Sequence, residues 1–523
     1  MTAPLLRPGY LLLRDAVSTP RSYLTDAALG LGESAPRAVP QDFAVACLSV
    51  LMDGGLVVKA VLVAALLLAG WGAGRLAALL LPEAALPGQL VATTLAVWNP
   101  YVAERLLQGH WSLLLGYGAL PWVAAAVLRL RMRPDRTRWA ALVFWVALAG
   151  LTPTGLLLAA VVAIVCVAAP GGGVRRGRLS AAVIGIAIAG ALPWLAASVL
   201  GGALGSRQAD GLAPFAARAE PGLGTFGSLA GLGGLWNAES VPPSRATLFA
   251  IAGTIVLLAV VVLGAITAIR RPAAEPLLML AAAAVILPAA LATGPGLAGL
   301  RAVVDSMPGL AVLRDGQKWV ALAMPGYAVA GAGAVLTLRR WARPGVSALV
   351  CAAALIAVLP DLAWGVGGRI APVRYPPQWA AVAARINADP LTVVSLPPDS
   401  MRRFDWAGPV PVLDPLPRWV RADVLSTGDL VVGGQTVPGE GSHAREVQRL
   451  VIAGADQATL ASAGVGWLLD ENTMRLNRIG GTTPGAPGWK RTVVMGAHLV
   501  WVAMLAAGAA GMIAGIRSRR PVR

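Results

Sequence analysis

Long apolar runs separated by short basic clusters constrain this chain more than any other feature of its sequence. The first run, residues 56–81, is long enough to cross a hydrocarbon core of about 30 Å as a helix. Only 13% of the 523 residues are charged, whereas a soluble protein has about 25%. The sequence therefore predicts an α-helical polytopic membrane protein with about eleven spans.

The basic clusters set the expected orientation. Arginine-rich loops between apolar segments are typical of the cytoplasmic side of a membrane protein, so the net charge of +17 does not indicate nucleic-acid binding. The clusters expected in the cytoplasm are 131–138, 174–178, 270–271, 339–343 and the C-terminal 517–523. The outer face then carries 1–55, 99–110, 201–245, 295–319 and 367–490.

An odd number of spans with a cytoplasmic C-terminus places the N-terminus outside. We therefore expect that a first helix is missing ahead of residue 1; the alternative keeps residues 1–55 inside, against the charge pattern. The composition, rich in Ala, Gly and Arg and poor in Lys, is typical of a high-GC bacterial genome. We expect a multi-pass protein of a bacterial plasma membrane.

Four regions follow from this topology. Residues 1–55 form an outer loop region, 56–366 a multi-spanning domain, and 491–523 the last helix with its basic cytoplasmic tail. Residues 367–490 alternate helical and short apolar segments, which predicts a small extracytoplasmic α/β domain with an incomplete sheet. It has no dinucleotide-binding glycine motif, so we expect it to cap the membrane domain or bind an acceptor.

The stretch 98–122, WNPYVAERLLQGHWSLLLGYGALPW, places Glu104, Arg105, Gln108 and His110 between two apolar runs. Its Asn99-Pro100 pair breaks the preceding helix, because proline lacks the backbone donor and restricts the residue before it. Ionisable groups at membrane depth are costly and so are functional candidates. The alternative is an ordinary interfacial loop with an aromatic belt.

A second polar segment, LRDGQKW (residues 313–319), borders a predicted span. Its Arg314 offers a planar fork and its Lys318 a point charge, a combination that suits a phosphate or pyrophosphate. The alternative is an interfacial anchor whose cations reach the lipid headgroups.

The sequence contains no Ser-His-Asp arrangement, zincin helix, Walker loop or cysteine-based metal site, so hydrolase and ATPase chemistry has no support. What remains is a carboxylate and cations at the outer membrane surface. That combination fits sugar transfer from a lipid-phosphate donor, in which the carboxylate takes the acceptor proton and cations stabilise the departing phosphate.

The motifs GYLLLRDAV, NPYVAERLLQGHWSLLLGYGALPW and LRDGQKW resemble the integral-membrane (C-type) glycosyltransferase superfamily, which uses polyprenyl-phosphate sugars. More narrowly, they resemble an actinobacterial branch related to mycobacterial arabinofuranosyl- and mannosyltransferases. Members place an essential acid in the first outer loop, which implies Asp15 here. This chain departs from the pattern, since a single Asp beside Arg14 replaces the common two-acid motif.

With this resemblance, we expect a cell-envelope glycosyltransferase that moves a sugar from a polyprenyl-phosphate donor to an envelope glycan or lipid acceptor. Asp15 would be the general base. Three cations would bind the donor phosphate: Arg105, Arg314 and Lys318. Four residues would line the acceptor side or relay protons: Glu104, His110, Asp315 and Gln317. The sequence implies no metal ligand and leaves a divalent cation open.

Two other functions stay open: a flippase of lipid-linked glycans, and a degenerate, non-catalytic scaffold. Convergence of residues 10–16, 99–111 and 313–319 on one outward cavity would support the transferase. A polar path through the bundle would support the flippase, and dispersal of these residues the scaffold.

Overall fold

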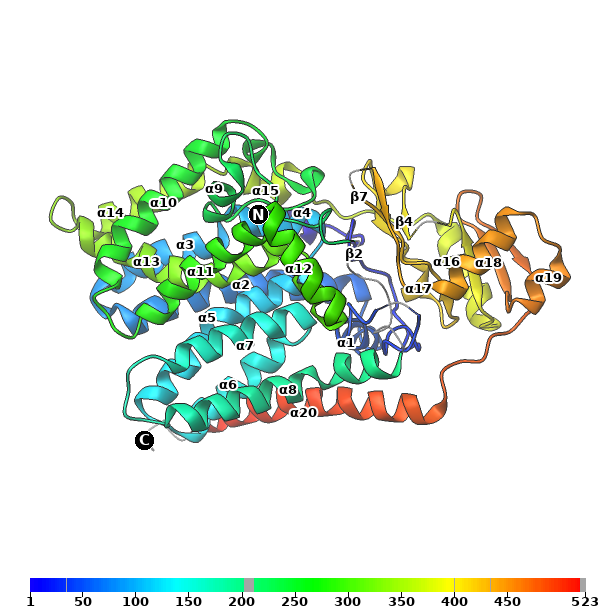
Figure 1. Cartoon of the computed structure of the whole chain (residues 1–523), viewed down its shortest axis with the longest axis horizontal. Helices are drawn as coiled ribbons and strands as arrows, with labels where there is room; N and C mark the ends of the chain where they lie inside the picture. The colour runs from blue at the N-terminus through cyan, green and yellow to red at the C-terminus, as the bar shows by residue number, and fades with distance from the viewer. Residues whose placement is uncertain (34, 202–210, 399, 433, 518–523) are drawn as a thin grey trace.

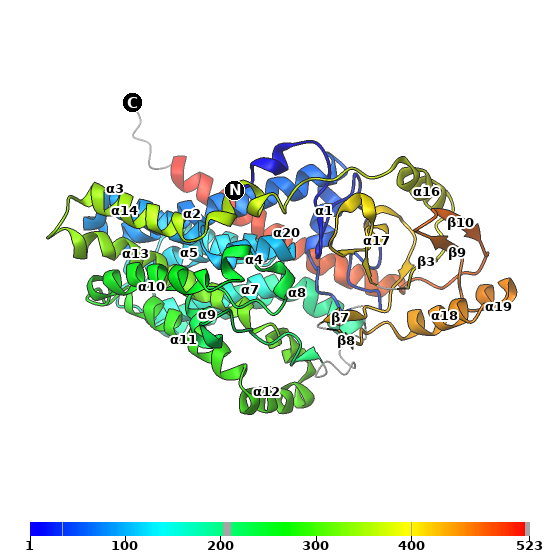
Figure 2. The same ribbon diagram turned by 90° about the horizontal axis from the view of Figure 1, so that it is seen from above.

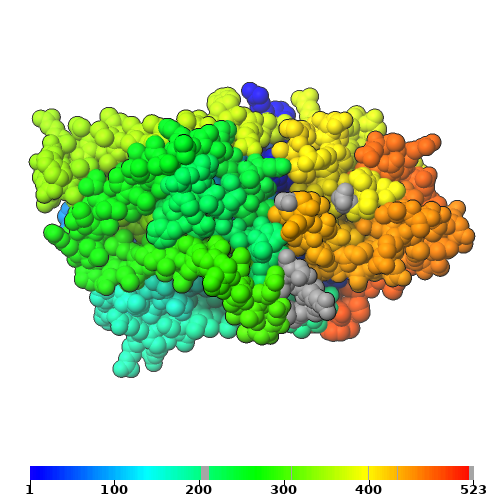
Figure 3. Space-filling view, turned by 45° about the horizontal axis from the view of Figure 1, so that its top comes forward, coloured from blue at the N-terminus to red at the C-terminus, as the bar shows by residue number. Residues whose placement is uncertain are grey.

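The computed structural model describes residues 1–33, 35–201, 211–398, 400–432 and 434–517. A bundle of helices occupies one side of the molecule and a smaller α/β domain the other, with the N-terminal segment between them (Figure 1). In the space-filling view the two parts form one continuous body (Figure 3). The predicted combination of a helical bundle with a C-terminal strand-containing region is confirmed.

Six helices in the described ranges are long and apolar enough to cross a membrane, or up to eight if each of two bent pairs counts as one span. The six are α2 (Gly54–Leu80), α5 (Trp111–Met132), α8 (Arg176–Leu200), α10 (Phe249–Ala268), the segment Gly316–Leu338, which joins η8 (Gly316–Leu322) to α13 (Ala323–Leu338), and α20 (Gly488–Arg517). The bent pairs are α11 (Glu275–Leu291) with α12 (Gly294–Ser306), and α14 (Pro344–Ala357) with η9 (Pro360–Leu362) and α15 (Ala363–Gly367).

Three further helices of the bundle are shorter: α3 (Ala85–Val97), α6 (Arg136–Ala149) and α7 (Pro153–Val167). The chain breaks between α6 and α7, where Thr152 Oγ1 accepts the Gly155 N–H (3.0 Å) and Pro153 occupies the first turn of α7. The short helices α1 (Gln41–Leu48), α4 (Pro100–Gln108) and α9 (Gly224–Ala230) complete the bundle.

The apolar helices divide into a central and a peripheral set. In α5 and in the segment Gly316–Leu338, 89% of the most apolar window is buried, against 11% in α20. Helix α20 lies along α8 at the edge of the bundle (Figure 1) and leaves apolar side chains such as Leu499 exposed. A helix that is apolar on all sides suits either a protein core or lipid, so the peripheral set is suited to face lipid.

Small residues let the central helices approach closely. A Cβ on Gly264 of α10 would lie 1.6 Å from the backbone oxygen of Ala330 in α13. Only glycine permits this contact, as at many helix interfaces in membranes.

The α/β domain is built on a four-stranded sheet in the order β10-β9-β3-β6. Strand β3 pairs parallel with β6 and β9, and β10 is an antiparallel edge. Its strands are β3 (Val393–Leu396), β6 (Val424–Leu425), β9 (Trp467–Asp470) and β10 (Arg475–Arg478), with two hairpin pairs, β4 (Met401–Arg402) with β5 (Val412–Leu413) and β7 (Leu430–Val432) with β8 (Gln435–Val437). Its helices are α16 (Pro377–Ala388), α17 (Leu416–Trp419), α18 (Ser442–Ile452) and α19 (Gln457–Ser462).

The N-terminal segment joins the two parts. Its strands β1 (Leu12–Leu13) and β2 (Ala16–Val17) form a hairpin with Arg14 and Asp15 at the turn. Leu12 is buried in the same hydrophobic cluster as Trp379 of α16. The Arg14 carbonyl accepts the N–H of Leu413 (2.9 Å) in β5. The turn is therefore held by the α/β domain on one side, and its other side faces the bundle.

Candidate functional site

Helix α4 brings the polar residues of the 98–122 stretch into the protein interior. Asn99 caps it: Oδ1 accepts the Val102 N–H (3.0 Å), and Nδ2 donates to the carbonyl of Leu95 (2.9 Å) at the end of α3. One side chain thus ends one helix and begins the next, with Pro100 in the first turn. Every residue of α4 is buried, so this stretch is a packed helix and not an exposed interfacial loop.

Gly109 ends α4 and provides the place where the N-terminal hairpin docks. Its φ of +82° lies in the left-handed region. A Cβ here would lie 2.3 Å from the oxygen of Leu13 and 2.4 Å from the nitrogen of Ala16. The N–H of Asp15 donates to the carbonyl of Gln108 (3.2 Å). Glycine at this position therefore allows the Arg14-Asp15 turn to lie directly on the end of α4.

Two neutral donors fix one oxygen of the Asp15 carboxylate. His110 Nε2 lies 2.9 Å from Asp15 Oδ2, and Gln108 Nε2 donates to the same oxygen (3.1 Å). His110 Nδ1 lies 3.0 Å from a nitrogen of Arg105, which can only donate, so Nδ1 is the acceptor and Nε2 carries the proton. No described residue hydrogen-bonds to Oδ1, and 35% of the Asp15 side chain is exposed. Asp15 is thus oriented through one oxygen and open at the other.

The Gly-rich loop between α8 and α10 orients the Gln108 amide. Gln108 Oε1 accepts from Asn237 Nδ2 (2.8 Å) and from the hydroxyl of Ser240 (2.7 Å), which leaves its Nε2 to donate to Asp15. Ser240 also accepts from Arg14 Nε (2.6 Å). Asn237, Ser240 and Gln108 were not among the predicted site residues. For Asn237 and Ser240 the only sequence signal was a short polar stretch, WNAES, inside a glycine-rich segment.

Arg105 connects the two polar segments of the sequence. Its guanidinium donates to both oxygens of Asp315 (2.9 and 3.0 Å) and to Gln317 Oε1. Gln317 Nε2 in turn donates to Glu104 Oε2 (3.1 Å), which also accepts the Leu235 N–H (3.1 Å). Hydrogen bonds therefore run from Glu104 through Gln317, Arg105 and His110 to Asp15.

Four of the eight predicted residues are buried: Glu104, Arg105, Asp315 and Gln317. Arg105, predicted to bind the donor phosphate, has no exposed surface, and its terminal nitrogens contact Asp315, Gln317 and His110. Glu104 is equally buried and does not line an open acceptor surface. Both are inside because α4 is covered on all sides. Lys318 keeps 26% of its side chain exposed, 3.7 Å from Asp315 Oδ2.

Arg314 points away from this hydrogen-bonded chain. Its guanidinium stacks over the ring of Phe215 at 4.4 Å. Burial lowers its pKa to about 10, the charge of Arg37 acts in the same sense, and Glu440 opposes it. The group stays cationic at neutral pH.

The charge states of the cluster follow from burial and neighbours. Burial opposes ionisation of Asp15, but the hydrogen bonds from His110 and Gln108 and nearby positive charge outweigh it and lower the pKa of Asp15. Burial lowers the pKa of His110, and its bond to Asp15 only partly offsets this. Burial, reinforced by the charge of Glu220, raises the pKa of Glu104 well above its ordinary value. At neutral pH the site therefore holds an ionised Asp15 beside a neutral His110.

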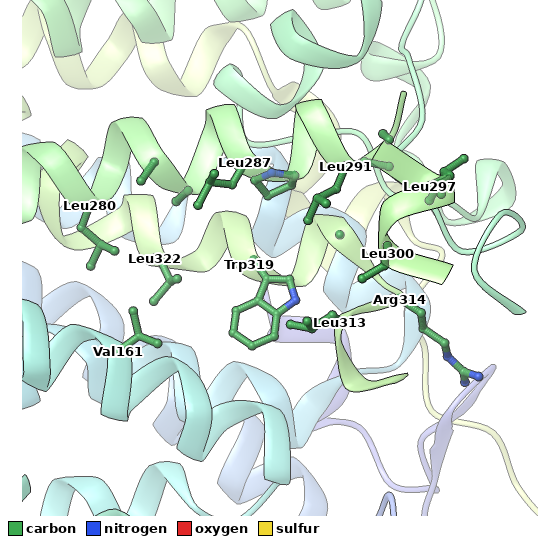
Figure 4. A pocket seen from close by; sticks show the side chains of 17 residues that line it. Val161, Leu280, Leu287, Leu291, Leu297, Leu300, Leu313, Arg314, Trp319 and Leu322 are labelled. Atoms are coloured by element: carbon green, nitrogen blue, oxygen red, sulfur yellow. The ribbon is translucent and has the colours of Figure 1, made fainter. Parts of the chain in front are cut away.

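An apolar cavity of about 270 Å³ extends from Arg314 into the bundle (Figure 4). It lies at the bend between α11 and α12, which meet at 91°. Its walls are leucine, alanine and proline side chains from these helices, with Leu313, Trp319 and Leu322 from the polar segment and the start of the following helix. Figure 2 shows α12 projecting from the bundle on this side. The cavity is apolar along its length and cationic at the Arg314 end.

Within the described ranges, no three His, Cys, Asp or Glu side chains gather in a way that could hold a metal ion. No family model matches the chain, and no curated protein matches it significantly.

Its structure is similar to the cryo-EM structure of the arabinofuranosyltransferase AftD from mycobacteria, with a TM-score of 0.55 and 19% identity over 91% of this chain. A mutant form of AftD gives a TM-score of 0.54 with the same identity and the same coverage of this chain. The chain spans 35% and 36% of the length of these two chains. It therefore shares its fold with part of a membrane glycosyltransferase.

Proposed function

We propose that this protein is a cell-envelope glycosyltransferase that moves a sugar from a polyprenyl-phosphate donor to an envelope glycan or lipid acceptor. The observation that carries the proposal is the Asp15 carboxylate: ionised, fixed through Oδ2 by His110 and Gln108, and open at Oδ1. The convergence of residues 10–16, 99–111 and 313–319 around it supports a transferase over a scaffold.

Asp15 is the general base. Its Oδ1 takes the proton of the acceptor hydroxyl while that oxygen attacks the anomeric carbon of the donor sugar. The bond from this carbon to the phosphate oxygen breaks, and its electron pair leaves with the polyprenyl phosphate. His110 cannot take the proton from the acceptor itself, because its Nδ1 faces Arg105 and its Nε2 already carries a hydrogen. Its role is to hold Asp15.

Lys318 and Arg314 are the cations for the donor phosphate. The apolar cavity suits an isoprenoid chain, and Arg314 at its end suits the phosphate that follows such a chain. The charges of Asp15 and Arg314 both act on Lys318, whose neighbour in the sequence, Trp319, lines the cavity. A developing negative charge on the leaving phosphate would be stabilised here, beside the base and away from the bulk solvent.

Arg105 positions the reacting groups without touching the substrate. Its bidentate contact fixes Asp315, which in turn faces Lys318, and its contact with His110 selects the tautomer that donates to Asp15. Gln317 and Glu104 hold Arg105 from behind. We assign these residues to the support of the base and the cation, in place of the phosphate-binding and acceptor-side roles expected from the sequence.

The arrangement of basic clusters supports an active site on the outer face. Arg131 donates to the carbonyl of Val174 (2.5 Å), and Gly515 packs against Thr137. Arg271 pairs with Glu83, and the charge of Arg339 acts on the same carboxylate. The basic clusters thus meet at the end of the bundle where α20 finishes, far from the α/β domain where it starts (Figure 1). By the positive-inside rule that end is cytoplasmic.

The test is Asp15→Asn expressed in a strain whose own gene has been deleted. The amide keeps the shape of the side chain but cannot accept the proton, so we expect the envelope glycan to stay defective, while the native protein restores it. The matched control is Asp305→Asn, an exposed carboxylate on α12. Full restoration by Asp15→Asn at a normal protein level would remove Asp15 from the catalytic role.

A further inference from the structure

A second group of cations lies beside the Asp15 turn and contacts different residues from Lys318 and Arg314. Arg14 Nη2 and Arg369 Nη2 both donate to the same carbonyl, that of Glu239, at 3.0 and 2.5 Å. Arg403 donates to the carbonyl of Pro409 (3.0 Å), two residues from Pro411, whose carbonyl accepts the Arg14 N–H. Four segments distant in sequence thus bring three guanidinium groups together, and we call them the arginine cluster.

Three carboxylates act on the arginine cluster, Glu239 and Asp15 on Arg14, and Asp361 with Glu239 on Arg369. Among the described residues, only Glu239 comes within 4 Å of one of its guanidinium groups. The Glu239 carboxylate approaches Arg14 only at 3.5 Å and is 64% exposed. Arg369 and Arg403 are exposed, and their charges act unfavourably on Arg14. Arg14 itself is buried, and its Nη1 has no hydrogen-bond partner. A buried guanidinium nitrogen without an acceptor is costly, so Nη1 of Arg14 has a donor to offer to an anion beside the two exposed guanidinium groups.

We propose that the arginine cluster binds an anionic group, a phosphate or a carboxylate, carried by the acceptor. Guanidinium groups bind both anions through paired N–H donors. Arg14 is the residue next to Asp15, and Ser240 links its Nε to the Gln108 amide that orients Asp15. An anion bound here would hold the acceptor next to the base through residues separate from those proposed for the donor phosphate.

This inference rests on the proposed function where it assigns the bound anion to the acceptor. Anion binding itself can be tested independently of that function. Purified protein in detergent would be titrated with inorganic phosphate and, separately, with glucuronate as a sugar carboxylate, with binding followed by calorimetry. The variant is Arg369→Gln with Arg403→Gln, two exposed side chains whose loss leaves the core intact. The control is Arg449→Gln with Arg475→Gln, two exposed arginines of the α/β domain.

We expect the native protein and the control to bind at least one of the two anions, and the Arg369/Arg403 variant to bind it roughly tenfold more weakly or worse. The anion that binds more tightly identifies the acceptor group as phosphate or carboxylate. Lys318→Gln should keep this binding, which separates it from phosphate held at the donor site. Equal affinity in the native protein and the Arg369/Arg403 variant, or no binding of either anion, would overturn the proposal.

A transfer assay gives the second readout. The Arg369/Arg403 variant should raise KM for the acceptor and leave KM for the polyprenyl-phosphate donor unchanged, because none of the three arginines lines the apolar cavity. A higher KM for the donor alone would overturn the assignment to the acceptor. If the native protein transfers no sugar, the proposed function fails while the titration still decides whether the arginine cluster is an anion site.

Discussion

Two buried arginines in this protein pair with buried carboxylates, but the contacts of only one of them extend to a partly exposed group. Arg105 in the bundle faces Asp315, and Arg402 in the α/β domain faces Glu471 (2.8 Å) and Asp414 (3.5 Å). From Arg105 the contacts continue through His110 to Asp15, which is partly exposed. From Arg402 they end at Ser395 and at the backbone beside Asp414, all buried. A buried ion pair becomes a candidate for function when its contacts reach an open group.

The largest effect that tests this comparison comes from replacing each arginine by methionine. Either change leaves a buried carboxylate without its cation, which typically costs about 3–5 kcal/mol. We expect both variants to lose stability by similar amounts in thermal denaturation. Only Arg105→Met should also lower the transfer rate per folded molecule, because only Arg105 holds His110 and Asp315. Equal activity loss per folded molecule in Arg402→Met would break the distinction between the two clusters.

A smaller effect is expected where the base meets the bundle, at Gly109. In Gly109→Ala the added Cβ would meet the backbone of Leu13 and Ala16 and push the Asp15 turn off α4. A displacement of about 1 Å at a reacting group can lower a rate about a hundredfold. The control is Gly454→Ala, which has a similar φ of +74° but no atom within 4 Å of the new Cβ.

Both glycine variants should lose about 1–2 kcal/mol from the left-handed backbone alone. Only Gly109→Ala should also lose transfer activity. Activity that falls equally in both variants would mean that backbone strain, and not the position of Asp15, is responsible.

The sequence predicted the parts of this site better than their roles. Length and apolar content located the long helices, and Asn99-Pro100 marked a helix end correctly, because caps and proline act through local backbone chemistry. Local signals cannot say which side of a short polar helix is covered. That depends on α4 meeting a loop more than 120 residues later, where Leu235 binds Glu104.

The roles of Arg105 and Arg14 show the same limit. An arginine in a polar segment can bind a ligand or hold its neighbours, and the difference is whether its donors are already used. Both terminal nitrogens of Arg105 are used by Asp315, Gln317 and His110, and its Nε alone lacks a partner. Asp315 and Gln317 lie about 210 residues away in the sequence. In Arg14 a terminal nitrogen, Nη1, has no hydrogen-bond partner. Such long-range contacts leave no pattern in a single sequence.

The smallest expected effect is a difference in how stability depends on pH at the Arg105 site, through His110, and at the Arg402 site, through Glu471. His110 binds its proton at lower pH in the folded protein than in the unfolded chain, because burial lowers its pKa. Its contribution to stability is therefore complete above about pH 6.5 and falls as the pH drops below that value. For Glu471 burial raises the pKa well above its ordinary value, with the charge of Asp414 acting in the same sense. Its contribution is complete below about pH 4.3 and is lost as the pH rises through the raised value.

Thermal denaturation between pH 4 and pH 8 should thus show opposite changes in two variants. His110→Asn should flatten the loss of stability below pH 6.5, a slope of at most about 1.4 kcal/mol per pH unit. Glu471→Gln should flatten the loss that appears as the pH rises. His443→Asn, on α18 at the edge of the α/β domain, is the control for a histidine outside both clusters. The same pH response in His110→Asn and His443→Asn would mean that burial does not lower the pKa of His110 in the folded protein.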